Sequence, residues 1–194
     1  MPLPLRLYLV RHGETDWSLS GRYTGRSDIS LTAQGEDDVR KLGQRLRQTQ
    51  FSYEFTSPMK RALRTGEIVQ LGAQRRIDPD LSEWNYGDYE GRTPAEISKM
   101  SPNWNLYRDG TPHGETPVEI SERADRLLVR LRALSGNVAL FSHGHFGRVL
   151  AARWIGLPVD MAQHFLLGTA SISILAYEHD RNDQPAISLW NSTT

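Results

Sequence analysis

Two histidines of this chain share one local context, each standing after an apolar segment and before a glycine. Residues 5–10 are mostly apolar and residues 138–141 entirely so, which predicts two buried strands that break into loops. Parallel strands present their carboxyl ends at one edge of a sheet, where α/β folds place their ligand sites. We therefore expect the two imidazoles to meet across a pocket. The pairs are His12-Gly13 and His143-Gly144.

Two arginines accompany the histidines. Arg11 directly precedes His12, and Arg61 lies in segment 57–62, where a predicted strand end passes into a predicted helix start. The positive end of a helix favours an anion, and arginine forks bind phosphate oxygens in pairs. Two guanidinium groups and two imidazoles therefore suit a phosphate dianion, with a nucleophile or base beside it.

Glu83 is the candidate general acid. Trp84, Tyr86 and Tyr89 lie close to it in the sequence. Apolar surroundings favour the protonated form of a carboxyl, and a protonated carboxyl can serve as a general acid near neutral pH. Glu83 is therefore expected to act as a general acid.

The rest of the sequence predicts the elements that position these residues. Segments 16–30, 82–91 and 101–116 lack periodicity and are expected to be loops. Strands alternating with helices predict an α/β fold, a three-layer α/β/α sandwich with a largely parallel mixed sheet whose last strand pair is antiparallel. No repeat or linker is present, so residues 1–194 are expected to form one catalytic domain. Further strands are predicted over 51–56, 171–177 and 186–190, and helices from Thr32, from Pro58, over 94–100, from Pro117 and over 149–155,.

Composition excludes several classes of partner. Lys and Arg total 23 and Asp and Glu total 23, so the formal net charge is zero and no global field attracts nucleic acid,. Cysteine is absent, which leaves no disulfide framework and no thiolate site,. No apolar run approaches the roughly 18 residues that a membrane helix needs. Residues 1–6 lack the features of a signal peptide, so a cytoplasmic protein without a membrane partner is expected.

Four motifs then occur in a fixed order: R-H-G-E-T at 11–15, S-P-x-x-R-A at 57–62, L-x-E-x-x-Y-G at 81–87 and S-H-G-H at 142–145. Together they resemble the histidine phosphatase (phosphoglycerate mutase-like) superfamily. The resemblance implies that His12 attacks phosphorus and becomes phosphohistidine, without a cofactor or metal. It further implies that Glu83 protonates the leaving oxygen and then activates water. Arg11, Arg61 and His143 would hold the equatorial phosphate oxygens.

Within that superfamily the chain is similar to the fungal sedoheptulose-1,7-bisphosphatase type, in segments 21–25, 83–91, 104–110 and 143–148. This likeness implies hydrolysis of phosphomonoesters of small sugar phosphates. Ser18 stands where many superfamily members carry asparagine, and in the fungal type the residue matching Arg148 meets the distal part of the sugar phosphate. The implied substrate-binding residues are Ser18, Tyr23, Thr24, Gly25, Tyr86, Gly144 and Arg148.

Other interpretations stay open at this point. A phosphoglycerate mutase shares the chemistry up to phosphohistidine, and a module that binds phosphate esters without turnover would need only the clamp. A metal hydrolase would use His143 and His145 as ligands. Glu115 is expected to belong to a helix entry rather than to the catalytic set. The expected partner is a small phosphate ester, and any homo-oligomer contact is expected around exposed apolar residues 154, 155 and 157.

Overall fold

The computed structural model describes residues 3–181 and 183–193. Within them, six strands form one mixed sheet in the order β3-β2-β4-β1-β5-β6. Strands β3, β2, β4 and β1 run parallel, and β5 and β6 are each antiparallel to the preceding neighbour. The predicted mixed sheet is confirmed, including its antiparallel last pair. The strands are β1 (Arg6–Arg11), β2 (Tyr53–Thr56), β3 (Arg75–Ile77), β4 (Asn137–Ser142), β5 (Ile172–Tyr177) and β6 (Pro185–Ser192).

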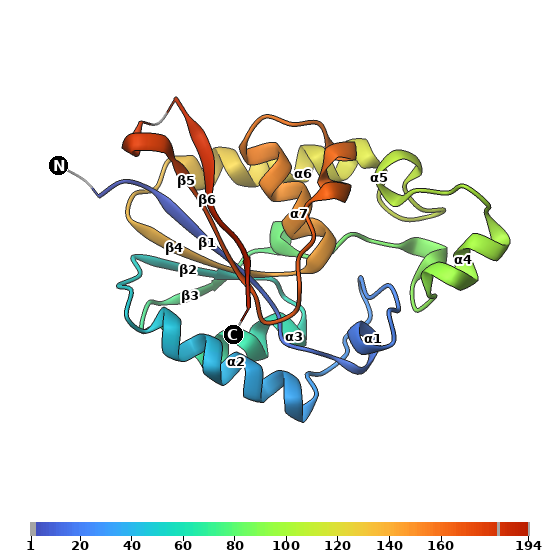
Figure 1. The fold of residues 1–194 in the computed structure, drawn as a ribbon, viewed down its shortest axis with the longest axis horizontal. Coiled ribbons are helices and arrows are strands. Elements are labelled where there is room, and N and C mark those ends of the chain that lie inside the picture. Colours follow the sequence, from blue (N-terminus) through green and yellow to red (C-terminus); the bar gives the residue numbers. More distant parts are fainter. Residues whose placement is uncertain (1–2, 182, 194) are drawn as a thin grey trace.

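Helices cover both faces of the sheet (Figure 1). Helices α2 (Ala33–Leu46) and α3 (Lys60–Val69) lie on one face, and α6 (Pro117–Arg132) and α7 (Gly144–Trp154) on the other. Side chains alternate across the sheet, so Leu7 and Leu9 of β1 pack with α6 and α7 while Val10 packs with α2,. The predicted three-layer α/β/α sandwich is therefore confirmed.

Strands β1 and β4 end at the same level of the sheet. Arg11 is paired with Ser142 in the parallel ladder, and the amide of His12 donates to the carbonyl of Ser142 at 3.1 Å. The residue that follows each strand is a histidine. The register therefore delivers His12 and His143 to one edge of the sheet, as parallel pairing requires.

Two helices begin at other residues than the sequence pattern predicts. Helix α3 begins at Lys60, whose amide donates to the Asp28 carboxylate at 2.7 Å, so Pro58 lies outside the helix rather than in its first turn. Helix α7 begins at Gly144, five residues before the expected start. In both cases a carboxylate distant in sequence accepts hydrogen bonds from the first amides, and no local pattern announces such a cap.

The segment between β3 and α6 carries several short helices. The predicted helix over 94–100 is confirmed as α4 (Pro94–Met100), but the expected loops also contain helical turns. Asn105 caps one of them by accepting a hydrogen bond from the Tyr107 amide at 2.9 Å. The additional elements are α1 (Asp16–Leu19), η1 (Pro79–Leu81), η2 (Gly87–Tyr89), α5 (Leu106–Asp109), η3 (Val159–His164) and η4 (Glu178–Asp180).

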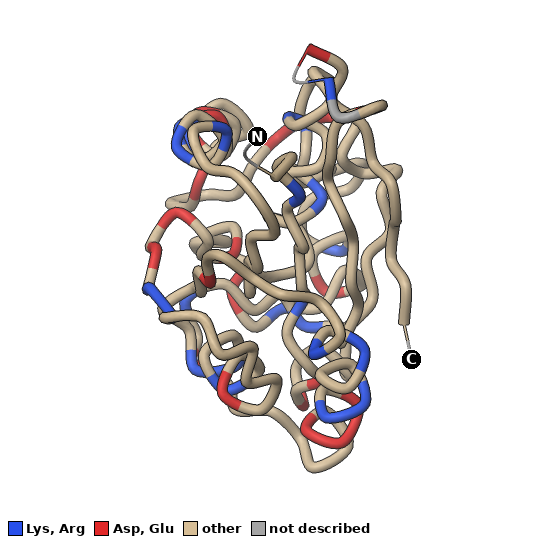
Figure 2. Tube along the Cα trace, turned by 90° about the vertical axis from the view of Figure 1, so that its left-hand side faces the viewer, with Lys and Arg blue, Asp and Glu red and all other residues tan. Residues whose placement is uncertain are grey.

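Charges are dispersed over the surface. Figure 2 shows basic and acidic segments interspersed on the face that it presents. Trp154, expected in an exposed apolar contact, is instead fully buried, with its indole N–H donating to the carbonyls of Ala176 and Ala186. None of the helices that the structure describes has the length and apolar character to cross a bilayer.

Candidate active site

His12 lies one residue beyond β1 with its ring buried. Its Nδ1 lies 2.7 Å from the Gly13 carbonyl oxygen, which can only accept, so Nδ1 carries the proton and Nε2 the lone pair,. Burial, together with the Arg61 and Arg11 charges, holds the pKa of His12 well below its usual range,. The imidazole is therefore neutral near pH 7, with a free Nε2 available as a nucleophile.

His143 faces His12 across the edge of the sheet, with ring centroids 5.3 Å apart. Its Nδ1 accepts from Nε of Arg61 at 3.2 Å, so the ring proton is on Nε2, which lies 2.7 Å from the Ser57 hydroxyl oxygen. Burial, and next the Arg61 charge, holds the pKa of His143 well below its usual range. Both ring nitrogens are thus engaged by protein partners.

Arg61 is fully buried at the start of α3. Burial lowers the pKa of Arg61, although guanidinium stays charged at any physiological pH,. Its remaining contacts join the loop between α1 and α2 to the histidine pair. Besides His143, its acceptors are the carbonyl oxygens of Thr24, Gly25 and Ser27, at 2.9 to 3.1 Å.

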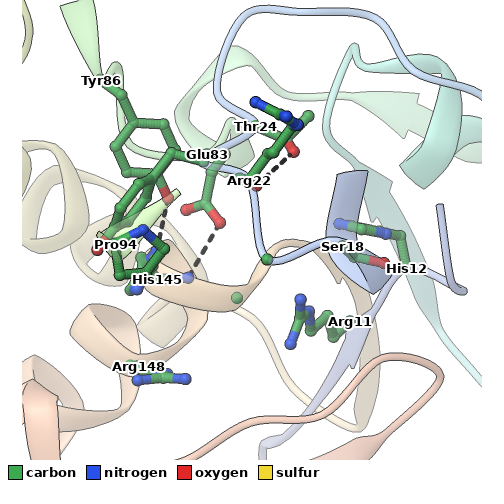
Figure 3. A pocket seen from close by; sticks show the side chains of 13 residues that line it. Arg11, His12, Ser18, Arg22, Thr24, Glu83, Tyr86, Pro94, His145 and Arg148 are labelled. Carbon is green, nitrogen blue, oxygen red and sulfur yellow. Dashed lines mark hydrogen bonds between the residues drawn. The ribbon is translucent and has the colours of Figure 1, made fainter. Parts of the chain in front are cut away.

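A cavity of about 210 Å³ opens beside His12 (Figure 3). Two buried guanidinium nitrogens at its wall, Nε of Arg11 and Nε of Arg148, have no hydrogen-bond partner among the described residues. Arg11 also donates through Nη1 to the Leu167 carbonyl, which fixes the direction of its fork. Buried donors are normally paired, so two free ones at one cavity indicate an anionic ligand.

Glu83 lies between His12 and the start of α7. One carboxylate oxygen accepts from the amides of Trp84 and Phe146 at 2.9 and 2.7 Å, and the other from the amide of His145 at 3.0 Å. The Glu83 carboxylate is therefore surrounded by amide donors as well as by the aromatic residues that the sequence predicted. The carboxylate caps α7, and this cap aims it into the cavity from a rigid element.

Aromatic rings form the wall opposite His12. The Tyr86 hydroxyl lies 2.6 Å from Nδ1 of His145, and the Tyr23 ring stacks on His145 at 5.5 Å between centroids. Burial, with the Arg148 charge, holds the pKa of His145 well below its usual range, and burial raises that of Tyr86 well above its own. His145 is therefore a neutral acceptor for the Tyr86 proton.

Most of the residues singled out in the sequence line this cavity, but three do not. Arg61 and His143 are not among the residues at this wall, and neither is Gly25, where a Cβ would come within 2.5 Å of the Trp84 carbonyl oxygen. Ser18 is at the wall, although its hydroxyl already donates to the Thr15 carbonyl as part of the α1 cap. The predicted residues at the wall are Arg11, His12, Ser18, Tyr23, Thr24, Glu83, Tyr86, Gly144 and Arg148.

Sequence reasoning missed Arg22 and His145 as cavity residues. His145 was weighed only as a metal ligand; its Nδ1 is bound to Tyr86, and both His143 nitrogens are bound to Arg61 and Ser57. Among the described residues, no group of three or more histidine, cysteine or acidic side chains is placed to hold a metal ion. His145 could have been identified from its position, because it is the second residue of a helix that begins at the site.

Glu115 does not form the helix entry. The α6 capping box consists of Thr116 and Glu119, and Glu115 instead forms an ion pair with Arg123 at 2.7 Å. The expectation that it stands outside the catalytic set agrees with its absence from the cavity wall.

Known proteins resemble this chain in sequence and in structure. The sequence profile of the histidine phosphatase superfamily (branch 1) matches residues 7–193. The chain belongs to this superfamily. An acid phosphatase of Mycobacterium tuberculosis is 38% identical over 178 residues, covering 90% of this chain and 87% of that protein. Sedoheptulose 1,7-bisphosphatase of Saccharomyces cerevisiae is 33% identical over 248 residues, covering 95% and 92%.

The structural comparison agrees with the sequence profile. The solved structure of an open reading frame product from Mycobacterium tuberculosis superimposes with a TM-score of 0.91 at 34% identity, covering 97% of each chain. The histidine phosphatase described here is therefore an enzyme of the phosphomonoester hydrolase class.

Proposed function

We propose that this histidine phosphatase hydrolyses phosphomonoesters of small sugars through a phosphohistidine formed at Nε2 of His12. The observation that carries the proposal is the neutral His12 ring, with its proton committed to the Gly13 carbonyl, beside unpaired donors of Arg11 and Arg148. A nucleophile with a free lone pair and an electropositive cavity is what attack on a phosphate dianion requires.

In the first step, Nε2 of His12 attacks phosphorus in line with the ester oxygen. The N–P bond forms as the P–O bond breaks, and Glu83 in its protonated form gives its proton to the departing oxygen. The proton comes from solvent or from a monoanionic ester, because the second pKa of a phosphate monoester is near 6. In the second step, Glu83 takes a proton from water, the water oxygen attacks phosphorus, and the N–P electron pair returns to His12.

The roles of Arg61 and His143 are proposed differently from those that the family resemblance implies. Arg61 makes four hydrogen bonds to protein acceptors, so we assign it the orientation of His143 and a positive charge behind the phosphate. We assign direct contact with the phosphate oxygens to Arg11, whose guanidinium group lies at the cavity wall,. His143 reaches the phosphate only by exchanging its Ser57 partner for an oxygen.

A second cavity supports a sugar as the leaving group. It has a volume of about 220 Å³ and shares Tyr23, Pro94 and His145 with the first. The Trp104 ring packs edge-on against Tyr23, and Asn105 donates to the Gln163 side chain at 3.1 Å within its wall. No Lys, Arg, Asp or Glu is among the described residues of this wall. Aromatic faces and neutral amides suit an uncharged polyhydroxylated chain better than a second phosphate.

The test is phosphate release from a panel of C3 to C7 sugar mono- and bisphosphates. Wild type is expected to release phosphate, and His12→Ala to release none while remaining folded. Acid-labile label from a radioactive substrate should appear on wild type and not on the variant. Substantial turnover by His12→Ala refutes the mechanism.

Two outcomes would replace the proposal. Isomerisation of 3-phosphoglycerate faster than its hydrolysis would identify a mutase, since the two reactions share the phosphohistidine. Tight binding of phosphate esters without turnover would identify a binding module. A panel in which chain length has no effect on kcat/KM would contradict the sugar subsite and leave the phosphatase chemistry standing.

A further inference from the structure

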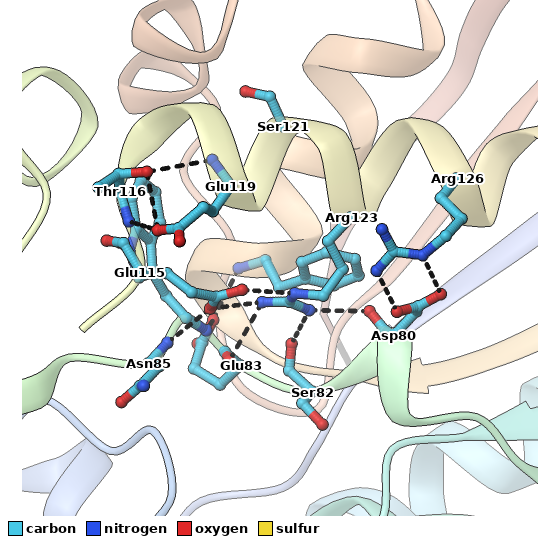
Figure 4. A network of polar contacts seen from close by, with 12 residues as sticks. Asp80, Ser82, Glu83, Asn85, Glu115, Thr116, Glu119, Ser121, Arg123 and Arg126 are labelled. Atoms are coloured by element: carbon cyan, nitrogen blue, oxygen red, sulfur yellow. Dashed lines mark hydrogen bonds and ion pairs between the residues drawn. The ribbon is translucent and has the colours of Figure 1, made fainter. Parts of the chain in front are cut away.

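An ion pair between Arg123 and Glu115 lies beside the segment that carries Glu83 (Figure 4). Arg123 projects from the middle of α6, and its side chain is only 9% exposed. Its partner Glu115 precedes α6 and is 16% exposed. Neither residue lines the cavity. A buried ion pair contributes little net stability on average, because removing two charges from water offsets their attraction. Stability alone therefore does not account for the position of this pair.

All five N–H groups of Arg123 are used. Nε and Nη2 donate to the two Glu115 oxygens at 2.7 and 2.8 Å, in the paired geometry that guanidinium and carboxylate prefer,. The other hydrogens go to main-chain carbonyls of one short segment. Their acceptors are Asp80 and Ser82 at 2.8 Å and Glu83 at 3.4 Å.

Glu115 holds the next residues of the same segment. Its carboxylate accepts from the Asn85 amide at 2.8 Å, its amide donates to the Asn85 carbonyl at 2.9 Å, and its carbonyl accepts from the Trp84 indole at 2.9 Å. The backbone on both sides of Glu83 is therefore fixed to the two members of one ion pair.

The same arginine also contacts the element that caps Glu83. Its guanidinium lies over the Phe146 ring, 4.4 Å from the centroid, and the Phe146 amide donates to the Glu83 carboxylate at 2.7 Å. The main chain of Glu83 is thus held from α6, and its carboxylate from α7. Such a double attachment matters because a catalytic group must be held to within about 0.5 Å of its productive position.

We infer that Arg123, neutralised by Glu115, is a positioning residue that places the Glu83 carboxyl for proton transfer to the leaving oxygen. This inference rests on the proposed function, since it assigns Arg123 to the acid step of that reaction. It touches no substrate and acts only through Glu83.

The experiment compares two kinds of leaving group. p-Nitrophenyl phosphate releases p-nitrophenolate, a stable anion that needs little help from an acid, whereas the alkoxide oxygen that leaves an alkyl ester such as a sugar phosphate must be protonated. kcat/KM reports the steps through phosphorylation of His12, so it isolates the acid role of Glu83 from its later role with water. The variants are Arg123→Gln, Arg123→Lys and Glu115→Gln, with Glu83→Gln as the reference for complete loss of the acid.

Arg123→Gln is expected to lower kcat/KM for the alkyl ester by about tenfold or more and that for the aryl ester by about threefold or less, following the pattern of Glu83→Gln. Arg123→Lys keeps the charge and some donors, so it is expected to lie between wild type and Arg123→Gln. Glu115→Gln retains a side-chain acceptor but leaves the Arg123 charge without its partner, and it is expected to shift the alkyl-to-aryl ratio in the same direction.

Arg126 provides the matched control. It lies three residues further along α6 with an exposed side chain, and it donates to the two oxygens of the Asp80 carboxylate at 3.2 and 2.8 Å. Arg126→Gln is expected to leave the alkyl-to-aryl ratio unchanged. Equal losses for both esters in the Arg123 and Glu115 variants would overturn the inference, because a purely structural defect does not sense the leaving group. A wild-type protein without phosphatase activity would instead refute the proposed function.

Discussion

Three neutral histidines, of which His12 and His143 are buried and His145 is partly buried, are expected to make this protein lose stability as the pH falls. His12, His143 and His145 all have a pKa held well below the usual value near 6.5, chiefly by burial and secondly by Arg61 or Arg148. The unfolded chain therefore binds protons near pH 6.5 that the folded chain does not bind. The free energy of unfolding therefore has its full value above about pH 6.5 and decreases as the pH falls below that value.

The size of the effect follows from proton linkage. Wherever the pH lies above the folded-state pKa, each such histidine lowers the free energy of unfolding by an amount on the order of 1 kcal/mol between pH 7.5 and 5.5, and the three together by roughly a few kcal/mol. That loss is a large fraction of the roughly 5 to 15 kcal/mol by which a domain is stable. Most carboxylates remain ionised over this interval, so the histidines dominate the slope.

Urea denaturation at pH 7.5, 6.5 and 5.5 measures the effect in wild type and in His145→Gln. The glutamine can still accept from Tyr86 but cannot titrate, so the free energy of unfolding of the variant should fall less than that of wild type over the interval, by an amount on the order of 1 kcal/mol. Comparing the two chains cancels the contribution of other groups, among them Glu54, whose pKa is raised by burial. His164→Gln, at an exposed residue of η3, is the control and should keep the wild-type slope.

A free energy of unfolding that stays constant in wild type from pH 7.5 to 5.5 would refute the reasoning. It would mean that the three rings titrate alike in the folded and unfolded chain, which neutral rings bonded to Gly13, Arg61 and Tyr86 do not allow. If the free energy of unfolding depends on pH equally steeply in wild type and in His145→Gln, then His145 does not contribute to the dependence. The effect would then be due to His12 and His143.

Three further outcomes follow from the packing and the site. Gly13→Ala is expected to lower the free energy of unfolding by about 1–3 kcal/mol, because a Cβ there would lie 2.7 Å from the Gly35 carbonyl oxygen; an unchanged urea midpoint would contradict that contact. Thr116→Val removes the hydroxyl that accepts from the Glu119 amide at the start of α6, and should cost about 1 kcal/mol, seen as a lower Tm in calorimetry. Arg11→Lys keeps the charge but loses the fork, so kcat/KM for a phosphomonoester should fall about tenfold or more without loss of fold; full activity would exclude Arg11 from phosphate binding.

Sequence pattern alone determined the layout of the protein and the chemical types at its site. Apolar runs ending in His-Gly predict strands, and parallel pairing requires their ends to share an edge, so the meeting of His12 and His143 follows from local pattern and topology. The helix that starts after Thr32 and the antiparallel last strands were likewise readable, because caps and alternation are local signals,.

Tertiary structure alone decided what each of those groups can do. The sequence shows that Arg61 is a cation, but only the fold surrounds it with carbonyl oxygens and turns it toward His143. It shows Glu83 among aromatic residues, but only the fold places three amide donors on its carboxylate and Arg123 behind its main chain. The side-chain contacts of Arg61 and the contact of Arg123 with the Glu83 carbonyl join residues that lie 34 to 82 positions apart, and they arise from packing of helices against the sheet, which no pattern within a few residues of the chain encodes.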